Sequence, residues 1–190
     1  MSPDAAHSQH NRDSVNLHAK GIAAIDHSLL TQLSFATTVD LSANSIDSMQ
    51  PLFYATNLVE LNLAANEIHT IEGLGNMPNL LRLILSFNLI SSLRGIAEIS
   101  STRFYYLDLK GNLIEDFSQL YYLAGLKSLK SLVLQDEENS SSLVNPICKN
   151  MNYSTRIFEI LPFLNSLDDP VLRYFPDMEE KYFLFDNNYT

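Results

Sequence analysis

One asparagine recurs along the middle of this chain every 22 to 24 residues, and this recurrence constrains the possible folds more than any other feature. An isoleucine follows each of these asparagines two positions later, and two apolar residues in alternate positions precede it, as in "LNLAANEI" at 61. The alternation is typical of a short strand, but the full spacing fits neither a long strand nor an amphipathic helix. It predicts a stack of similar units that bury their apolar sides against one another. The recurring asparagines are Asn44, Asn66, Asn88 and Asn112.

The aligned units share the template L-x-x-L-x-L-x-x-N-x-I, which resembles the leucine-rich repeat. The resemblance implies an α/β solenoid with a concave parallel β-sheet, and with short helices or turns on the convex side. We expect each asparagine amide to satisfy backbone groups that the turn removes from water. A fifth strand at 132–134 reads "LVL" and lacks the asparagine. The apolar residues expected to fill the convex side are Met49, Leu52, Ile71, Leu74, Leu93, Ile96, Phe117 and Leu120.

Both ends of the repeat region carry sequences that can close its apolar core, as a solenoid requires. At the front, "KGIAAIDHSLLTQL" from residue 20 predicts a half-repeat. At the back, "NPICKNMNYSTRIFEILPFLNSLDD" is similar to the C-terminal cap of this repeat subclass, except that its basic residue is displaced to Arg156. The residues that match the cap pattern are Tyr153, Leu161, Pro162, Leu164, Leu167 and Asp168.

The predicted organisation therefore has three parts: an N-terminal tail at 1–14, a capped leucine-rich repeat domain at 15–169 and an aromatic C-terminal tail at 170–190. The last part holds six aromatic residues, which is too many for an inert linker. It either folds back over the last repeat or docks on a partner, and the sequence leaves both alternatives open.

Composition and missing motifs exclude several classes of function. The chain has 190 residues and a formal net charge of −10, which opposes direct binding of nucleic acid. A single cysteine, Cys148, provides no intrachain disulfide framework. No run resembles a secretory signal or a membrane-spanning helix, so we expect a soluble, cytoplasmic protein. Phosphate-binding, zinc-protease and nucleophile-elbow motifs are absent and the histidines are scattered, so we expect no enzyme activity, no cofactor and no metal site.

Function in such a solenoid is expected on the concave sheet, because its outward side chains do not pack in the apolar core. On the third to fifth strands these positions combine an apolar centre with a charged rim. Interfaces concentrate their binding energy in aromatic and arginine anchors, which makes Tyr106 and Arg82 the leading candidates. The predicted partner-binding residues are Arg82, Ile84, Phe87, Tyr106, Asp108, Lys110 and Val133.

Two stretches resemble one particular family. "KGIAAI" at 20 and "RFYYLDLKGNLIEDFSQLYYLAGLKSLKSLVLQDEENSSSLVNPIC" from 103 are similar to the N-terminal repeat domain of the leucine-rich-repeat and coiled-coil centrosomal and basal-body proteins. The resemblance implies a noncatalytic scaffold that binds protein partners at a centriole, basal body, cilium or axoneme, without direct contact to nucleic acid or membrane. That family continues into a long coiled coil and no heptad region exists here, so the chain is either the repeat domain alone or a shorter relative. The alternative function is a regulatory subunit of a type-1 protein phosphatase, or a similar intracellular adaptor.

Overall fold

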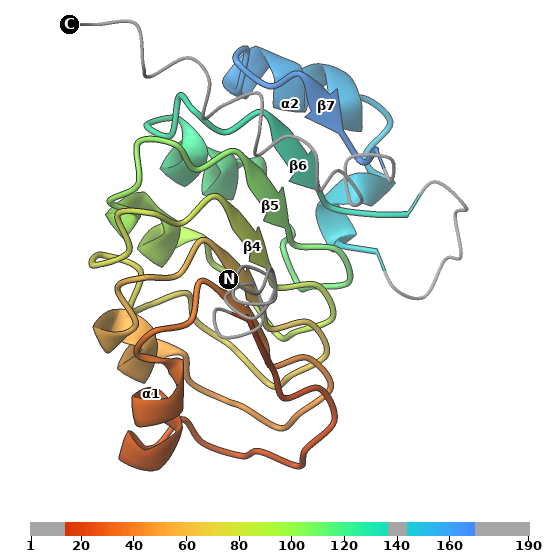
Figure 1. The fold of residues 1–190 in the computed structure, drawn as a ribbon. Helices are drawn as coiled ribbons and strands as arrows, with labels where there is room; N and C mark the ends of the chain where they lie inside the picture. The colour runs from red at the N-terminus through yellow and green to blue at the C-terminus, as the bar shows by residue number, and fades with distance from the viewer. Residues whose placement is uncertain (1–13, 137–143, 170–190) are drawn as a thin grey trace, which may run out of the picture.

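A computed structural model of the protein describes residues 14–136 and 144–169. Within these residues one parallel sheet of seven strands runs through the molecule, and each strand pairs with the next strand in the sequence (Figure 1). This order is that of a solenoid, in which every turn contacts only its neighbours. The strands are β1 (Ser14–Asn16), β2 (Thr38–Asp40), β3 (Glu60–Asn62), β4 (Arg82–Ile84), β5 (Tyr106–Asp108), β6 (Ser131–Val133) and β7 (Ser166–Leu167).

Most of the short helices lie on the side of the molecule opposite the strands, whereas the last two lie at the C-terminal end of the sheet (Figure 1). The first helix begins where the Asp26 carboxylate accepts a hydrogen bond from the Leu29 N–H at 2.8 Å. Helices and parallel strands therefore take the places that the repeat template predicts. The helices are α1 (His27–Leu33), η2 (Gln50–Tyr54), η3 (Arg94–Glu98), η4 (Phe117–Leu123), η5 (Pro146–Lys149) and α2 (Tyr153–Ile160).

A single apolar core runs along the inside of the turns. Leu61 and Leu63 of the β3 unit are completely buried, whereas Asn62 between them is half-buried, as the alternation of strand side chains requires. The residues predicted to fill the convex side all belong to the same core. Strand leucines and convex-side residues thus meet inside each turn, and a turn alone could not bury either set.

The recurring asparagines form a ladder of hydrogen bonds that joins successive turns. Asn66 Oδ1 accepts a hydrogen bond from the Ile46 N–H at 3.0 Å, and its Nδ2 donates to the carbonyls of Leu41 and Leu63 at 3.0 Å each. One side chain therefore satisfies backbone groups of its own turn and of the preceding turn. Asn44, Asn88 and Asn112 repeat this arrangement, which confirms the structural role predicted for them.

The ladder has a fifth member, Asn145, so the prediction that the fifth unit lacks its asparagine was wrong. Asn145 Oδ1 accepts from the Ile114 N–H at 3.0 Å, and its Nδ2 donates to the carbonyls of Leu109 and Leu134 at 2.8 Å each. Asn112 lies three residues after the leucine of its own turn, whereas Asn145 lies eleven residues after Leu134. An insertion separates this asparagine from its strand, so its spacing does not match the repeat template and the sequence analysis did not recognise it.

The residue before each of four ladder asparagines has a left-handed backbone, which lets the chain turn sharply away from the strand. For a residue other than glycine this conformation costs roughly 1–2 kcal/mol. Three of the four turns bear that cost without a glycine. The residues and their φ angles are Ala43 (56°), Ala65 (54°), Phe87 (58°) and Gly111 (66°).

Two edge strands, β1 and β7, extend the sheet beyond the predicted strands. β1 pairs with β2 and crosses the predicted boundary between the tail at 1–14 and the repeat domain. Its sequence, "VNLHAKGI", follows the template except that Lys20 stands in the asparagine position. The Lys20 N–H instead donates to Asn44 Oδ1 at 3.0 Å. At the other end β7 pairs with β6 and completes the C-terminal cap.

Asp168 closes the C-terminal end of the solenoid. Its Oδ1 accepts from the N–H groups of Leu134 and Gln135 at 2.7 and 3.2 Å, and its Oδ2 accepts from the Tyr153 hydroxyl at 3.0 Å. Burial raises the pKa of the Asp168 carboxyl, although these donors act in the opposite direction. Burial also raises the pKa of Tyr153, which keeps its hydroxyl a donor at neutral pH. The two cap residues predicted from the sequence therefore meet in one buried contact.

Arg156, the displaced basic residue of the cap, contacts a different part of the protein. Its guanidinium lies 4.2 Å from the centre of the Phe117 ring, so it joins α2 to η4. Such a cation–π contact contributes about 0.5–1 kcal/mol at an exposed site. The displaced basic residue thus stays on α2 and contacts the neighbouring helix η4.

Candidate partner-binding face

The strand register places five of the seven predicted site residues side by side on one face of the sheet. Arg82 on β4 pairs with Tyr106 on β5. Ile84 pairs with Asp108, which in turn pairs with Val133 on β6. The structure therefore brings these residues together, and their role in binding stays a prediction.

The other two predicted residues, Phe87 and Lys110, contact each other just after β4 and β5. Lys110 Nζ lies 4.8 Å from the centre of the Phe87 ring and 2.9 Å from Asp136 Oδ1. Lys110 is buried and Phe87 is half-buried. The lysine charge is thus already paired within the chain, and Phe87 is the more accessible of the two side chains.

A second set of contacts gives several outward polar residues a structural role that the sequence analysis missed. Asp40 Oδ1 accepts from the Ser42 N–H at 2.9 Å, Asn62 Oδ1 accepts from the Ala64 N–H at 3.0 Å, and Asp108 Oδ1 accepts from the Lys110 N–H at 3.0 Å. Asn16 on β1 makes the same contact with the His18 N–H. These Asx turns hold the chain as it leaves each strand. The recurrence of Asp or Asn at the last strand position was the available sequence signal.

Ile84 occupies the same position on β4 and departs from this rule. An isoleucine has no oxygen for the Ser86 N–H, so β4 lacks the local hydrogen bond that its neighbours have. Ile84 is half-buried on the outward side of the sheet, between Asn62 and Asp108. β4 therefore lacks the Asx hydrogen bond and has the apolar side chain of Ile84 in its place. This exchange of a stabilising contact for an apolar group is the strongest indication of a binding role on this face.

Arg82 is held between two neighbouring strands. Its guanidinium carbon lies 4.8 Å from the centre of the Tyr106 ring, and its Nε lies 3.9 Å from Glu60 Oε1. The arginine side chain is 12% exposed, and Tyr106 is 1% exposed. Tyr106 is therefore part of the packed face in this structure, and it could act as a binding anchor only after a rearrangement.

Exposure divides the predicted face into two parts. On β2, β3 and β4 the first and third residues of each strand are half-buried, and only the central residue is completely inside. On β5 and β6 all three residues of each strand are buried. We call the outward side of β2–β4 the open face and the outward side of β5–β6 the covered face. Of the predicted residues on the strands, Arg82 and Ile84 lie on the open face.

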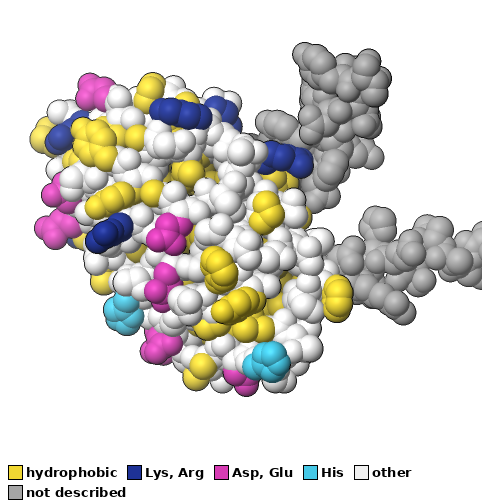
Figure 2. All heavy atoms as spheres, turned by 90° about the vertical axis from the view of Figure 1, so that its left-hand side faces the viewer, with side chains coloured by type: hydrophobic (Ala, Val, Ile, Leu, Met, Phe, Trp, Pro, Cys, Tyr) yellow, Lys and Arg dark blue, Asp and Glu magenta, His cyan; other side chains and the backbone are white. Residues whose placement is uncertain are grey.

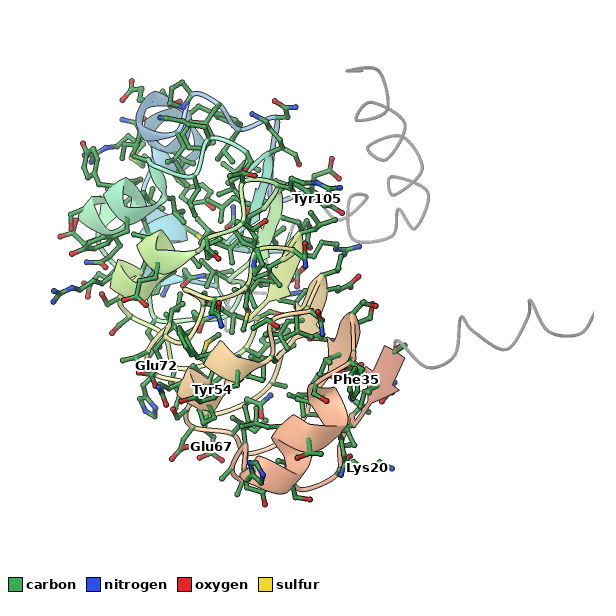
Figure 3. All side chains as sticks on the ribbon, turned by 60° about the vertical axis from the view of Figure 1, so that its left-hand side comes forward. Lys20, Phe35, Tyr54, Glu67, Glu72 and Tyr105 are labelled. Atoms are coloured by element: carbon green, nitrogen blue, oxygen red, sulfur yellow. The ribbon has the colours of Figure 1, made fainter. Side chains whose placement is uncertain are left out.

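The helical side also exposes large apolar side chains, including Tyr54 and Tyr121. Figure 2 shows that acidic and basic side chains interrupt the hydrophobic ones on this side. In Figure 3 Tyr54 lies on the same side as Glu67 and Glu72, whereas Tyr105 lies on the side of the strands. Scattered apolar residues of this kind are normal on protein surfaces and define no continuous patch.

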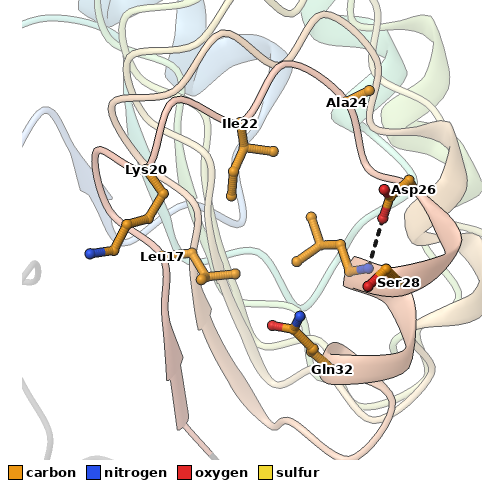
Figure 4. A pocket seen from close by; sticks show the side chains of 8 residues that line it. Leu17, Lys20, Ile22, Ala24, Asp26, Ser28 and Gln32 are labelled. Carbon is orange, nitrogen blue, oxygen red and sulfur yellow. Dashed lines mark hydrogen bonds between the residues drawn. The ribbon is translucent and has the colours of Figure 1, made fainter.

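A pocket of about 310 Å³ opens at the N-terminal end, between the first turn and α1 (Figure 4). Leu17 and Ile22 line one side of it, and Leu29 and Gln32 line the other. Figure 4 also shows the hydrogen bond from the Leu29 N–H to Asp26 at its edge. Within the described part of the chain the pocket lies at the N-terminal end of the repeat stack, and its lining carries no cluster of reactive groups.

The described residues offer little material for metal or thiol chemistry. No group of three or more His, Cys, Asp and Glu side chains among them is placed to hold a metal ion. Cys148 is half-buried, and burial raises the pKa of its thiol to about 11, which leaves little thiolate at neutral pH. No helix in the same part of the chain is long and apolar enough to span a membrane.

Comparison with known proteins defines the class of fold. No protein-family model matches the chain. Among solved structures it resembles an internalin (inlF) from Listeria monocytogenes with a TM-score of 0.51 and 18% identity, over 82% of this chain and 46%, about half, of that one. An internalin C2 (inlC2) from the same species gives a TM-score of 0.49 and 20% identity, over 83% of this chain and 74% of that one. The first likeness, the asparagine ladder and the seven-stranded parallel sheet confirm a leucine-rich repeat solenoid.

Proposed function

We propose that this protein is a noncatalytic interaction module that binds a protein partner on the open face of its sheet, with Ile84 as the central anchor. The observation that carries this proposal is the half-buried isoleucine in a position where neighbouring strands have an Asp or Asn that makes an Asx turn. Burial of one such side chain in an interface contributes about 1.5–3 kcal/mol. Arg82 and Phe87 lie beside this anchor and complete the site.

The proposed setting is a microtubule-based assembly such as a centriole, basal body or axoneme. Support for this setting comes from the resemblance of residues 20–25 and 103–148 to the centrosomal repeat family. The proposed localisation is accordingly cytoplasmic and associated with the cytoskeleton. Partners there would be centriolar, axonemal or microtubule-associated proteins.

Replacement of Ile84 by Asn tests the site without disturbing the fold. The new amide matches Asn62 on the adjacent strand and can accept a hydrogen bond from the Ser86 N–H, so we expect thermal stability to be equal to or above that of the wild type. Recovery of partners on the tagged protein from its own cells should fall about tenfold or more, because the apolar anchor is lost. Tyr121→Asn, which removes an exposed apolar side chain from the helical side, is the control and should leave recovery unchanged.

The outcomes test the proposed binding face and the proposed cellular assembly separately. Full partner recovery by a natively melting Ile84→Asn variant would exclude the open face as the binding site. Loss of recovery for Tyr121→Asn instead would move the site to the helical side. A phosphatase catalytic subunit recovered in near-stoichiometric amount would replace the centrosomal setting with the regulatory-subunit alternative, while the fold would be unaffected.

A further inference from the structure

Two consecutive turns have an exposed leucine at the edge where the chain leaves the strands. Leu89 and Leu113 each follow a ladder asparagine directly, and they are 39% and 50% exposed. The two preceding turns have Ser45 and Glu67 in this place, and both are exposed polar residues. The leucines therefore depart from the polar choice at a position that faces water.

Backbone hydrogen bonds place the two leucines beside each other. The Leu89 N–H donates to the Ile68 carbonyl at 2.9 Å, and the Leu113 N–H donates to the Ile90 carbonyl at 2.8 Å. Each leucine thus occupies the same place in its own turn. Neighbouring hydrogen-bonded backbones lie about 4.8 Å apart, so the two side chains form one apolar patch on the surface.

Phe87 joins this patch to the open face. It is half-buried and lies three residues after Ile84 and two before Leu89. Its φ angle is 58°, which a bulky side chain seldom adopts, and the adjacent turns have an alanine and a glycine in the same place. A large side chain in a strained turn indicates a function for that side chain. We call Phe87, Leu89 and Leu113 the apolar edge.

The charged side chains closest to the apolar edge along the turns are acidic. Glu67, Glu115 and Asp116 are all exposed. Lys110 is buried and paired within the chain, and Lys149 belongs to the following turn. No lysine or arginine occurs in the three segments that form this edge, which are residues 66–70, 88–92 and 112–116.

This combination of apolar and acidic groups selects one kind of occupant. An anionic membrane surface would be repelled by the carboxylates. A second copy of this chain would bring its own net charge of −10. The complementary surface is a protein segment that has apolar side chains between lysine or arginine side chains.

We infer that the partner site continues from the open face over the apolar edge, and that it binds a basic amphipathic segment of the partner there. Leu89 and Leu113 contact the apolar stripe of this segment, and Glu67 and Glu115 pair with its basic side chains. The inference rests on the proposed function, because the apolar edge adjoins the proposed face, and it adds the chemical class of the partner.

Two synthetic helical peptides test the chemistry of the occupant. They have the same stripe of leucines, flanked by lysines in the first and by glutamates in the second. We expect the full-length protein to bind the lysine peptide at least about tenfold more tightly, because only this peptide complements Glu67 and Glu115. Isothermal titration calorimetry measures both dissociation constants.

Removal of the two leucines tests the apolar contact. Leu89→Ser combined with Leu113→Ser should weaken binding of the lysine peptide by about tenfold or more, with a native melting curve, because Ser45 already shows that this place accepts serine. Tyr54→Ser, which removes a 71% exposed side chain from the helical side, is the control and should change binding less than about twofold.

Charge reversal tests the acidic flank. Glu67→Lys combined with Glu115→Lys should make the glutamate peptide the tighter ligand. Glu98→Lys combined with Glu159→Lys gives the same change in net charge at exposed positions of η3 and α2. This control should keep the preference for the lysine peptide within about threefold of the wild-type value.

Several results would overturn the inference. One is lysine-peptide binding that the leucine substitutions leave unchanged, because general attraction to an acidic chain would then explain it. Others are equal affinity for the two peptides, and no detectable binding of the lysine peptide.

The Ile84→Asn variant separates this inference from the proposed function. Loss of lysine-peptide binding in both Ile84→Asn and the leucine variant would support one continuous site. Loss in the leucine variant alone would support the apolar edge and remove the open face from the site. Loss in Ile84→Asn alone would exclude the apolar edge and leave the proposed function intact.

Discussion

At the scale of single residues, the ladder asparagines stabilise this fold beyond what their size suggests. Asn66, Asn88, Asn112 and Asn145 each bond a buried N–H and two buried carbonyl groups. Exposed asparagines make similar hydrogen bonds, but the loss of such a bond costs less free energy. Asn57, for example, donates to the Ser34 carbonyl at 2.7 Å on the surface, where water can replace it.

We therefore expect Asn66→Ala to lower the free energy of unfolding by about 3 kcal/mol or more, because it leaves three buried backbone groups without partners. Asn57→Ala should lower it by less than about 1 kcal/mol. Urea denaturation of both variants at neutral pH measures the difference. Similar losses for the two substitutions would show that the ladder is no more stabilising than a surface contact.

At the scale of elements, the turns after the strands combine a favourable hydrogen-bond pattern with an unfavourable backbone. The ladder asparagine and the Asx turn together fix the chain where it leaves the strand, and the residue between them must accept a positive φ angle. Ala65 bears this cost at an exposed site, so its side chain offers no packing in return. Strain of this kind persists only where surrounding contacts determine the conformation.

Ala65→Gly should therefore stabilise the protein by roughly 0.5–1 kcal/mol, since relief of the left-handed conformation exceeds the entropic cost of glycine. The same substitution at Ala124, where φ is −62°, should destabilise it, because no strain is relieved there and both the entropic cost of glycine and the loss of a methyl group packed against the core remain. Calorimetric melting temperatures of the two variants give the signs directly. A lower melting temperature for Ala65→Gly would contradict this account of the turn.

The sequence predicted elements well where the repeat is regular, and poorly where a contact depends on three-dimensional neighbours. The units around Asn66 and Asn88 were predicted correctly because their periods match. β1 escaped detection because Lys20 replaces the asparagine, and Asn145 because an insertion precedes it. Tyr106 is buried and its ring lies against the Arg82 guanidinium of the neighbouring strand, a contact that no local pattern encodes. For the candidate site, the sequence identified which side chains share a face but not which of them are accessible.

At the scale of the whole molecule, the two ends of the solenoid are closed unequally. The C-terminal end carries α2, β7 and the buried contact between Asp168 and Tyr153. At the N-terminal end, among the described residues, β1 pairs with β2 alone, and the pocket beside Leu17 leaves the first turn incompletely packed. In a stack stabilised by nearest neighbours, the less complete end opens first.

Hydrogen exchange should reveal this asymmetry. The Leu17 N–H, bonded to the Asp40 carbonyl in β2, should exchange about tenfold faster or more than the Leu85 N–H, bonded to the Asp108 carbonyl in β5. The Asp168 N–H, bonded to the Leu132 carbonyl, should be better protected than that of Leu17. Equal protection at all three sites would mean that the stack opens as one cooperative unit.

Asn145 shows that this architecture can lengthen at one edge without changing its interior. It reaches the same kinds of backbone groups as Asn112, although eleven residues separate it from its leucine in place of three. The ladder asparagine thus makes the same kinds of hydrogen bonds whether three or eleven residues separate it from the leucine of its turn. New sequence can be inserted at this edge while the curvature and register of the sheet stay the same, which makes the turn after β6 the natural graft site of the molecule.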